Sequence, residues 1–128
     1  MIRGRHRVAA AVSLAVVVAA AAAVAVARPR RVVVEGASME PTLAEGDRLL
    51  VIRGRRVVPG DLVVLRDPRE RRRILVKRAT SVVGDEVMVH GDNPPASTDS
   101  RAFGPVPRRA LLGRVVRRYQ RGVPQPPR

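Results

Sequence analysis

The sequence is organised around one stretch, Gly36-Ala37-Ser38-Met39-Glu40-Pro41-Thr42-Leu43. Two small residues lead into a serine, and a proline follows three positions later. Glycine reaches backbone angles that other residues avoid, and proline fixes its own φ, so the pattern predicts a tight turn around Ser38. A hydroxyl held still on an exposed corner suits a nucleophile. Most serines beside glycine and proline simply occupy turns, however, and this stretch alone leaves both interpretations open.

A second residue, Lys77, stands out from the composition. It is the only lysine among the 25 lysines and arginines of the chain. Arginine keeps its proton in proteins, whereas lysine can lose a proton when it is desolvated. A single lysine in such a chain indicates a position that needs a neutral amine. The alternative is chance, because a strongly arginine-biased composition must place its few lysines somewhere.

The composition limits the classes of function. The 128 residues leave room for one domain. The absence of cysteine excludes disulfides and thiolate metal sites, and two histidines are too few for a histidine site, so neither a metal nor a cofactor is expected. A net charge of +14 favours anionic partners, either a membrane surface or nucleic acid. With one Phe, one Tyr and no Trp there is little for bases to stack on, which argues against nucleic acid as the partner.

The N-terminus predicts a membrane anchor. Residues 1–7 are basic, and residues 8–27 are alanine and valine apart from Ser13 and Leu14. Twenty helical residues span roughly 30 Å, enough to cross the core of a bilayer. A cleaved signal peptide is the rival interpretation, because Ala25-Val26-Ala27 resembles a cleavage site. The length of the apolar run favours a retained anchor, and arginines on both sides leave its orientation open.

Beyond the anchor the pattern is that of a β domain, which we place at residues 31–120. Short apolar runs alternate with Gly-Asp and Pro-Gly-Asp turns, which predicts a mainly β, compact antiparallel barrel-like domain. The strands are expected at residues 32–34, 48–52, 62–65, 74–83, 87–90 and 115–119. The other expected features are a solvated charged hairpin tip at 69–73, one helical turn at 108–112 and a disordered Pro-rich tail at 121–128.

Strand alternation places Lys77 in an apolar setting. In an extended strand over residues 74–83, Lys77 shares a face with Leu75 and Ala79, while Arg78 points the other way. Desolvation lowers a lysine pKa, and bringing it from about 10.4 to neutrality takes roughly three units, or about 4 kcal/mol. Such a cost is plausible only for a functional amine. The alternative is a lysine that protects a sheet edge from aggregation.

Several segments resemble one family in the same order. Residues 36–43 look like the nucleophile box of type I signal peptidases, peptidase family S26, and residues 46–47 and 59–65 resemble the strands that follow it. Residues 75–78 and 84–85 resemble the general-base box, and residues 91–93 and 97–106 resemble the final box. The resemblance covers about residues 32–119. It implies a catalytic dyad of Ser38 and Lys77, in which the neutral amine takes the hydroxyl proton.

The same resemblance implies supporting residues. Ser97 would hydrogen-bond the amine, and Asp99 and Arg101 match an ion pair that shapes the site, although such a pair can equally be a weak surface salt bridge. Gly36 stands where some relatives carry a hydroxyl residue that donates to the oxyanion. Met39 follows the serine within the nucleophile box. His90 is a conceivable alternative base, but its place next to Gly91 indicates a strand end.

The resulting prediction is a single-pass, membrane-anchored serine endopeptidase, with its catalytic domain outside the cytoplasm at the cell membrane. Its substrates would be preproteins with small, Ala-x-Ala-like residues before the cut, selected by pockets near residues 33–36 and Leu75. One alternative is the branch that removes the N-terminal extension of nickel-type superoxide dismutase, which residues 77–79 and 111–115 also resemble. A basic membrane-surface or nucleic-acid-binding protein would explain the charge, but not the ordered boxes.

Overall fold

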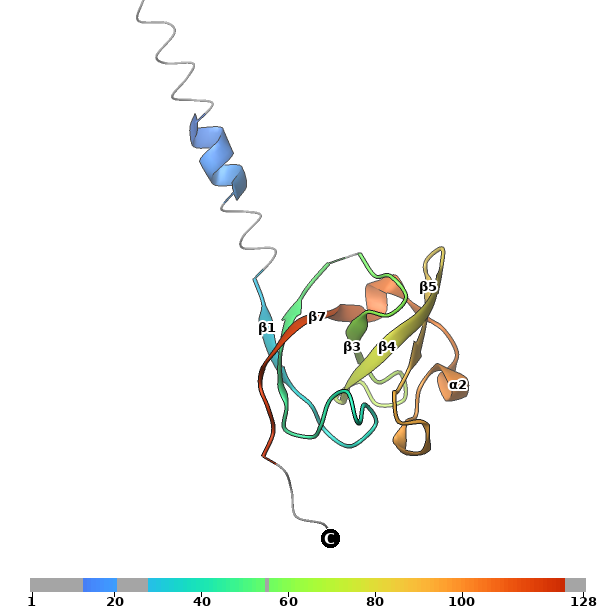
Figure 1. Ribbon diagram of the computed structural model, residues 1–128. Coiled ribbons are helices and arrows are strands. Elements are labelled where there is room, and N and C mark those ends of the chain that lie inside the picture. Colours follow the sequence, from blue (N-terminus) through green and yellow to red (C-terminus); the bar gives the residue numbers. More distant parts are fainter. Residues whose placement is uncertain (1–12, 21–27, 55, 124–128) are drawn as a thin grey trace, which may run out of the picture.

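The fold is an antiparallel sheet, described by a computed structural model for residues 13–20, 28–54 and 56–123 (Figure 1). The prediction of a mainly β antiparallel domain is confirmed. The strands of the described residues are β1 (Arg30–Val33), β2 (Arg48–Ile52), β3 (Leu62–Arg66), β4 (Ile74–Val83), β5 (Glu86–His90), β6 (Val106–Pro107) and β7 (Leu111–Gln120). Short helical turns are η1 (Pro94–Ala96), α2 (Ser100–Phe103) and η2 (Arg108–Ala110).

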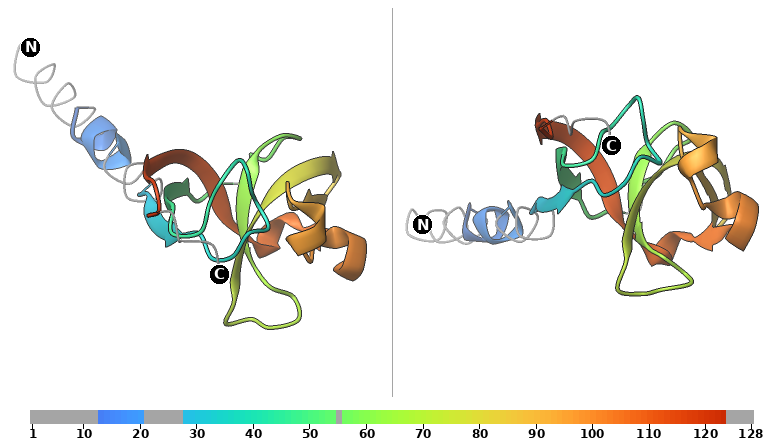
Figure 2. Two further views of the ribbon diagram at one scale, coloured as in Figure 1. Left: turned by 60° about the horizontal axis from the view of Figure 1, so that its bottom comes forward. Right: turned by 90° about the horizontal axis from the view of Figure 1, so that it is seen from below.

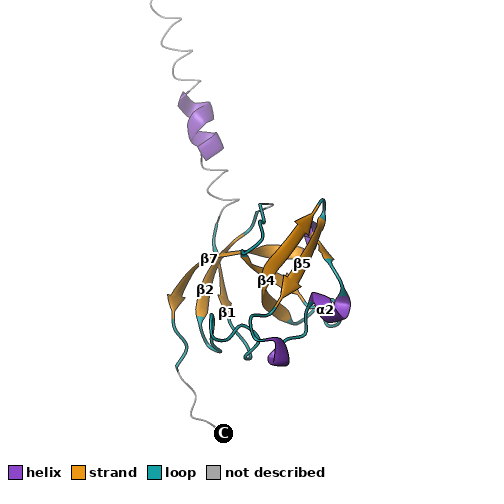
Figure 3. Cartoon of the chain, turned by 45° about the vertical axis from the view of Figure 1, so that its right-hand side comes forward, coloured by secondary structure: helices purple, strands orange, loops and turns teal. Residues whose placement is uncertain are grey.

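The strand order is β1-β2-β7-β3-β4-β5-β6, so β7, the last described strand, joins the two halves of the sheet. The sheet curves strongly (Figure 3), and register shifts along β7 and β4 are the kind of irregularity that bends strands. Over the described residues the sheet does not close into a barrel, so the barrel-like part of the prediction is wrong. The edge strand β6 has only two residues, and its Pro107 lacks a backbone N–H for a further ladder.

Both faces of the curved sheet are covered, because β4 sends alternate side chains into two apolar clusters. Leu75 and Ala79 pack with residues of β3 and β5, whereas Val76 packs with residues of β2 and the segment after β1. Lys77 lies between Leu75 and Ala79 on the strand and is only 2% exposed. The alternation that was expected for residues 74–83 therefore describes the strand as it is found.

The predictions for the two ends of the chain fall mostly outside the described residues. Of the anchor expected at residues 8–27, only residues 13–20 are described, and they are helical; the rest lies outside the described residues, as do the basic start and residues 124–128 of the tail. Within the described residues no helix has the length and apolarity to cross a membrane. The expected helical turn is shorter than 108–112, because β7 begins at Leu111. The α2 helix, which lies beside β5 (Figure 3), was not predicted.

Candidate active site

The serine turn, residues 36–43, follows β1, and two of its side chains are buried in the apolar core. Met39 and Leu43 are 1% and 4% exposed and belong to the apolar cluster that contains β2 residues. The backbone N–H of Leu43 donates to the Met39 carbonyl at 2.9 Å. Gly36 has a φ of +75°, which favours glycine, while a Cβ there would meet nothing within 4 Å. Position 36 therefore favours glycine because of its backbone angle, and not because a side chain there would collide with a neighbouring atom. The turn leaves Ser38 half-buried.

A loop from the other half of the sheet holds this turn in place. We call Gly91-Asp92-Asn93 the glycine loop. The backbone N–H of Asn93 donates to the Ser38 carbonyl at 2.9 Å, and its side-chain amide donates to the Ala37 carbonyl at 2.9 Å. Gly91 fits tightly, because a Cβ at this position would lie 2.7 Å from the Ser38 carbonyl oxygen and 2.2 Å from Ser97 Oγ. The loop thus fixes the backbone on which Ser38 stands.

Asp92 of the glycine loop ties β4 to the serine turn. Its carboxylate accepts hydrogen bonds from Arg78 Nε at 2.9 Å and Nη2 at 2.8 Å, and from Thr42 Oγ1 at 2.5 Å. The hydrogen bonds from Arg78 lower the pKa of Asp92, against the opposing effect of burial. Arg78 therefore serves this link on the side of β4 away from Lys77, as strand alternation predicts.

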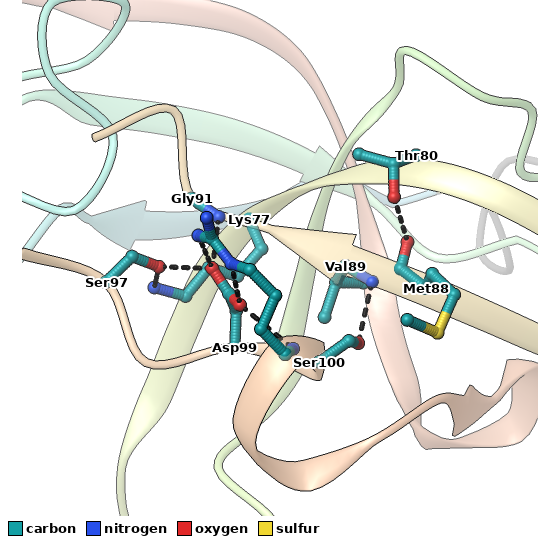
Figure 4. Close-up of polar contacts among 9 residues, drawn as sticks. Lys77, Thr80, Met88, Val89, Gly91, Ser97, Asp99 and Ser100 are labelled. Carbon is teal, nitrogen blue, oxygen red and sulfur yellow. Dashed lines mark hydrogen bonds and ion pairs between the residues drawn. The ribbon is translucent and has the colours of Figure 1, made fainter. Parts of the chain in front are cut away.

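Lys77 belongs to a second set of contacts, the lysine network (Figure 4). Its Nζ donates to Ser97 Oγ at 3.0 Å, and the Ser97 hydroxyl donates to Asp99 Oδ2 at 2.7 Å. Asp99 is 1% exposed and also accepts from the Gly91 N–H at 2.8 Å and from Arg101 Nε at 2.9 Å. The structure thus brings together the residues that the resemblance selects here. The Asp99–Arg101 pair is not the surface salt bridge of the alternative interpretation, because its carboxylate is buried.

The surroundings of the lysine network lower the pKa values of both Asp99 and Lys77. Burial acts to raise the pKa of Asp99, but hydrogen bonds from Arg101, Ser97 and the Gly91 N–H outweigh it and hold that pKa well below its usual range. Burial lowers the pKa of Lys77 below its ordinary value of 10.5; the Asp99 carboxylate opposes this effect, while Arg73 and Arg101 add to it. The site therefore combines a carboxylate that stays ionised with an amine that gives up its proton more readily than usual.

Ser38 and Lys77 line the same cleft, which has a volume of about 80 Å³. The serine turn and the end of β1 form one wall, and the beginning of β4 forms the other. Ser97, Asp99 and Arg101 do not line the cleft, although Ala96 and Thr98 do. Residues 69–73 are all exposed, as predicted for a solvated hairpin tip, but Arg69 and Arg73 also line the cleft. The cause is the buried carboxylate of Asp67, which holds Arg69 through three hydrogen bonds.

The other candidate residues do not join Ser38 and Lys77 at the cleft. His90 ends β5, and its Nε2 is buried without a hydrogen-bond partner among the described residues. The Ser100 hydroxyl accepts from the Val89 N–H at 2.8 Å, which fits a structural role. Over the described part of the chain, no three metal-ligating side chains are grouped. Asn93 and the close fit of Gly91 were missed by sequence reasoning, because a turn-forming Gly-Asp-Asn segment carries no signal of its tertiary contacts.

Comparison with known proteins defines the class as a peptidase. Residues 5–92 and 80–120 match the sequence model of the family described as signal peptidase, peptidase S26, and the chain belongs to this family. Among curated relatives, mitochondrial ATP-independent inner membrane protease subunit 1a of Arabidopsis thaliana is 35% identical, over 66% of this chain and 67% of that protein.

Two further relatives are mitochondrial inner membrane protease subunit 1 of Homo sapiens and of Xenopus tropicalis. The human protein is 28% identical over 66% of this chain and 65% of its own length, and the frog protein is 32% identical over 68% and 66%. The chain therefore spans about two thirds of the length of these curated relatives.

Proposed function

We propose that residues 31–120 form the catalytic domain of a serine endopeptidase in which Ser38 and Lys77 act as a dyad. One observation carries the proposal: a buried lysine with a lowered pKa lines the same cleft as a serine held on a fixed turn. In its neutral form the amine accepts the Ser38 proton as the hydroxyl oxygen attacks the scissile carbonyl. The amine then passes this proton to the leaving amino group, which completes acyl transfer to the serine.

The neighbouring groups support this chemistry. Ser97 and Asp99 hold Lys77 Nζ in place, a positioning role that needs no further base. The backbone N–H of Ser38 has no hydrogen-bond partner within the described residues, so it is available to an oxyanion formed beside it. Gly36 contributes no side-chain donor. We assign the remaining stabilisation of the oxyanion to backbone groups of the serine turn.

The edges of the sheet suggest how a peptide lies in the cleft. Among the described residues, β1 pairs only with β2, and β5 pairs with β4 only from Arg78 onward. Residues 74–77 therefore have one side without a described partner strand. The cleft lies between these two free edges, and an extended substrate there gains backbone hydrogen bonds of the kind made by an added strand. Its volume of about 80 Å³ is small beside the roughly 300–1,000 Å³ of ligand pockets, which favours small side chains.

The proposed substrates are therefore preproteins with small, Ala-x-Ala-like residues before the cut. We assign membrane anchoring to residues 8–27, and with it a single-pass protein whose catalytic domain lies outside the cytoplasm. The uncharged composition of that segment supports the assignment, and so do relatives named as inner membrane proteases. Bilayer and preprotein are then the partners of the chain.

A cleavage assay tests the proposed function. The purified full chain in detergent is incubated with a peptide containing Ala-x-Ala and with a matched peptide containing Leu-x-Leu, and the products are identified by mass spectrometry. We expect cleavage directly after the second alanine, and at least about tenfold lower kcat/KM for the leucine peptide, because each added methylene crowds the cleft. Equal cleavage of both peptides would contradict the small-residue pocket, and no cleavage of either would contradict the peptidase assignment.

The lowered pKa of Lys77 predicts a rising pH–rate profile. Only the unprotonated amine accepts a proton, so kcat/KM should increase about tenfold per pH unit until the pH passes the pKa of Lys77, and should level off above it. Because burial lowers this pKa, the midpoint should lie below 10.5. Asp99 cannot produce this rise, since its lowered pKa keeps it ionised throughout. Initial rates on an uncharged peptide, with circular dichroism at each pH, provide the measurement; a flat profile from about pH 6 to about pH 10 would exclude Lys77 as the base.

A further inference from the structure

Two arginines of one hairpin line the cleft together with Ser38 and Lys77. The basic hairpin, residues 66–73, connects β3 to β4 and projects from the sheet (Figure 2). Asp67, 1% exposed, shapes its base: its backbone N–H donates to the Arg73 carbonyl at 2.8 Å. Of the four arginines in residues 69–73, only Arg69 and Arg73 line the cleft. The hairpin therefore places two selected guanidinium groups where a bound peptide would pass.

These two guanidinium groups are not equivalent. Arg69 is engaged by the Asp67 carboxylate, through an ion pair of 3.1 Å. The Arg73 guanidinium makes no hydrogen bond and no ion pair with any described residue. Its charge nevertheless reaches the site, since Arg73 adds to the effect of burial in lowering the pKa of Lys77. Arg73 is thus a cation that faces the cleft and has its donors available.

One carboxylate on the opposite wall has to be weighed against it. Glu35 lines the cleft next to Gly36 and forms no ion pair with Arg69 or Arg73 among the described residues. Glu35 stands three residues from Ser38, whereas Arg73 stands before the first residue of β4, four positions from Lys77. Glu35 and Arg73 therefore stand on opposite walls of the cleft, where each can meet a different side chain of an extended substrate.

We propose that Arg73 binds a carboxylate side chain of the substrate, about three to five residues before the scissile bond. This inference rests on the proposed function, in which the peptide lies extended beside residues 74–77. An extended chain advances about 3.3 Å per residue, in step with the neighbouring strand, so a substrate residue about four positions before the cut arrives opposite Arg73. The planar guanidinium offers paired donors to a carboxylate there. Arg73 is then a specificity-determining residue.

Peptides of one sequence that differ at a single position test this inference. Each carries Ala-x-Ala before the cut, with Asp, Asn or Lys at the fourth residue before the scissile bond. We expect the full chain to cleave the Asp peptide with a kcat/KM about tenfold above that of the Lys peptide at low salt, because attraction and repulsion each contribute a few-fold at an exposed site. The difference should shrink at about 0.5 M salt. In the Arg73→Glu variant the order of the Asp and Lys peptides should reverse.

The ratio between peptides is compared within each variant, because Arg73 also influences Lys77. Arg72→Glu is the matched control, since Arg72 belongs to the same hairpin and does not line the cleft, so it should keep the original order. Glu35→Gln should also keep that order. Equal cleavage of the three peptides by the unmodified chain, or an unchanged order in Arg73→Glu, overturns the role of Arg73 and leaves the dyad standing. If the unmodified chain cleaves none of them, the proposed function itself fails, and this inference fails with it.

Discussion

The variants Ser38→Ala and Lys77→Arg should each lose peptidase activity by about 10⁴-fold or more, the scale at which members of a catalytic unit act. Alanine removes the attacking oxygen. Arginine preserves the positive charge, but it cannot give up its proton and so cannot serve as the base. Single-turnover rates on the Ala-x-Ala peptide, measured at saturating enzyme, separate this chemical loss from weaker binding.

Two controls show whether such a loss reflects chemistry or misfolding. Ser81→Ala removes a half-buried hydroxyl from the same strand as Lys77, outside the cleft, and should leave the rate within about twofold. Lys77→Met keeps an unbranched side chain of similar length without the amine, and should be as inactive as Lys77→Arg while retaining its fold by circular dichroism. Normal cleavage by either Ser38→Ala or Lys77→Arg would refute the dyad.

Gly91→Ala should damage the site without touching a reacting group. The added Cβ would fall 2.2 Å from Ser97 Oγ and 2.7 Å from the Ser38 carbonyl oxygen. Rotating the Ser97 hydroxyl away would break its contact with Lys77 and would still leave the Ser97 Cβ 2.5 Å from the added methyl. The Ser38 carbonyl belongs to the backbone of the serine turn, so it cannot move aside without shifting that turn. Overpacking of this kind costs about 1–3 kcal/mol of stability, and a displacement of about 1 Å in the site can cost about 10²-fold in rate.

Gly54→Ala is the matched control for this variant, because a Cβ at Gly54 meets nothing within 4 Å and its φ is not in the left-handed region. Chemical denaturation and kcat/KM should both change in Gly91→Ala and remain near the original values in Gly54→Ala. If Gly91→Ala keeps full activity and stability, the close packing of the glycine loop against the serine turn does not hold in solution.

The strands could be predicted because their signals are local. Apolar alternation over residues 74–83 and the Gly84-Asp85 turn that ends it are properties of neighbouring residues, and β4 has the predicted limits. Whether a sheet closes into a barrel depends on whether its two edge strands, here β1 and β6, pair with each other. No single segment of the sequence carries this information. The barrel-like part of the prediction therefore failed at the two ends of the sheet, where the two-residue strand β6 and strand β1 do not meet.

The candidate site divides in the same way. The unusual composition singles out Lys77, and the order of the boxes pointed to Ser97, Asp99 and Arg101, which the structure brings together. The contacts of Asn93 with the serine turn join residues more than fifty positions apart, so they could not be inferred from spacing. Arg73 follows two other arginines, so the sequence could not show which of them lines the cleft. That distinction comes from the fold of the hairpin.

One side of β1 has no partner strand among the described residues, and this has a consequence for the protein in solution. A free β edge can recruit any extended chain, including the same strand of another copy, and this is how ordered aggregates begin. β1 opens with Arg30 and Arg31, both exposed, and the Arg31 guanidinium lies over the ring of Tyr119, 5.8 Å from its centroid. Two copies brought together along this edge would bring four cations together. The exposed arginines of β1 thus deter self-stacking along this edge through electrostatic repulsion.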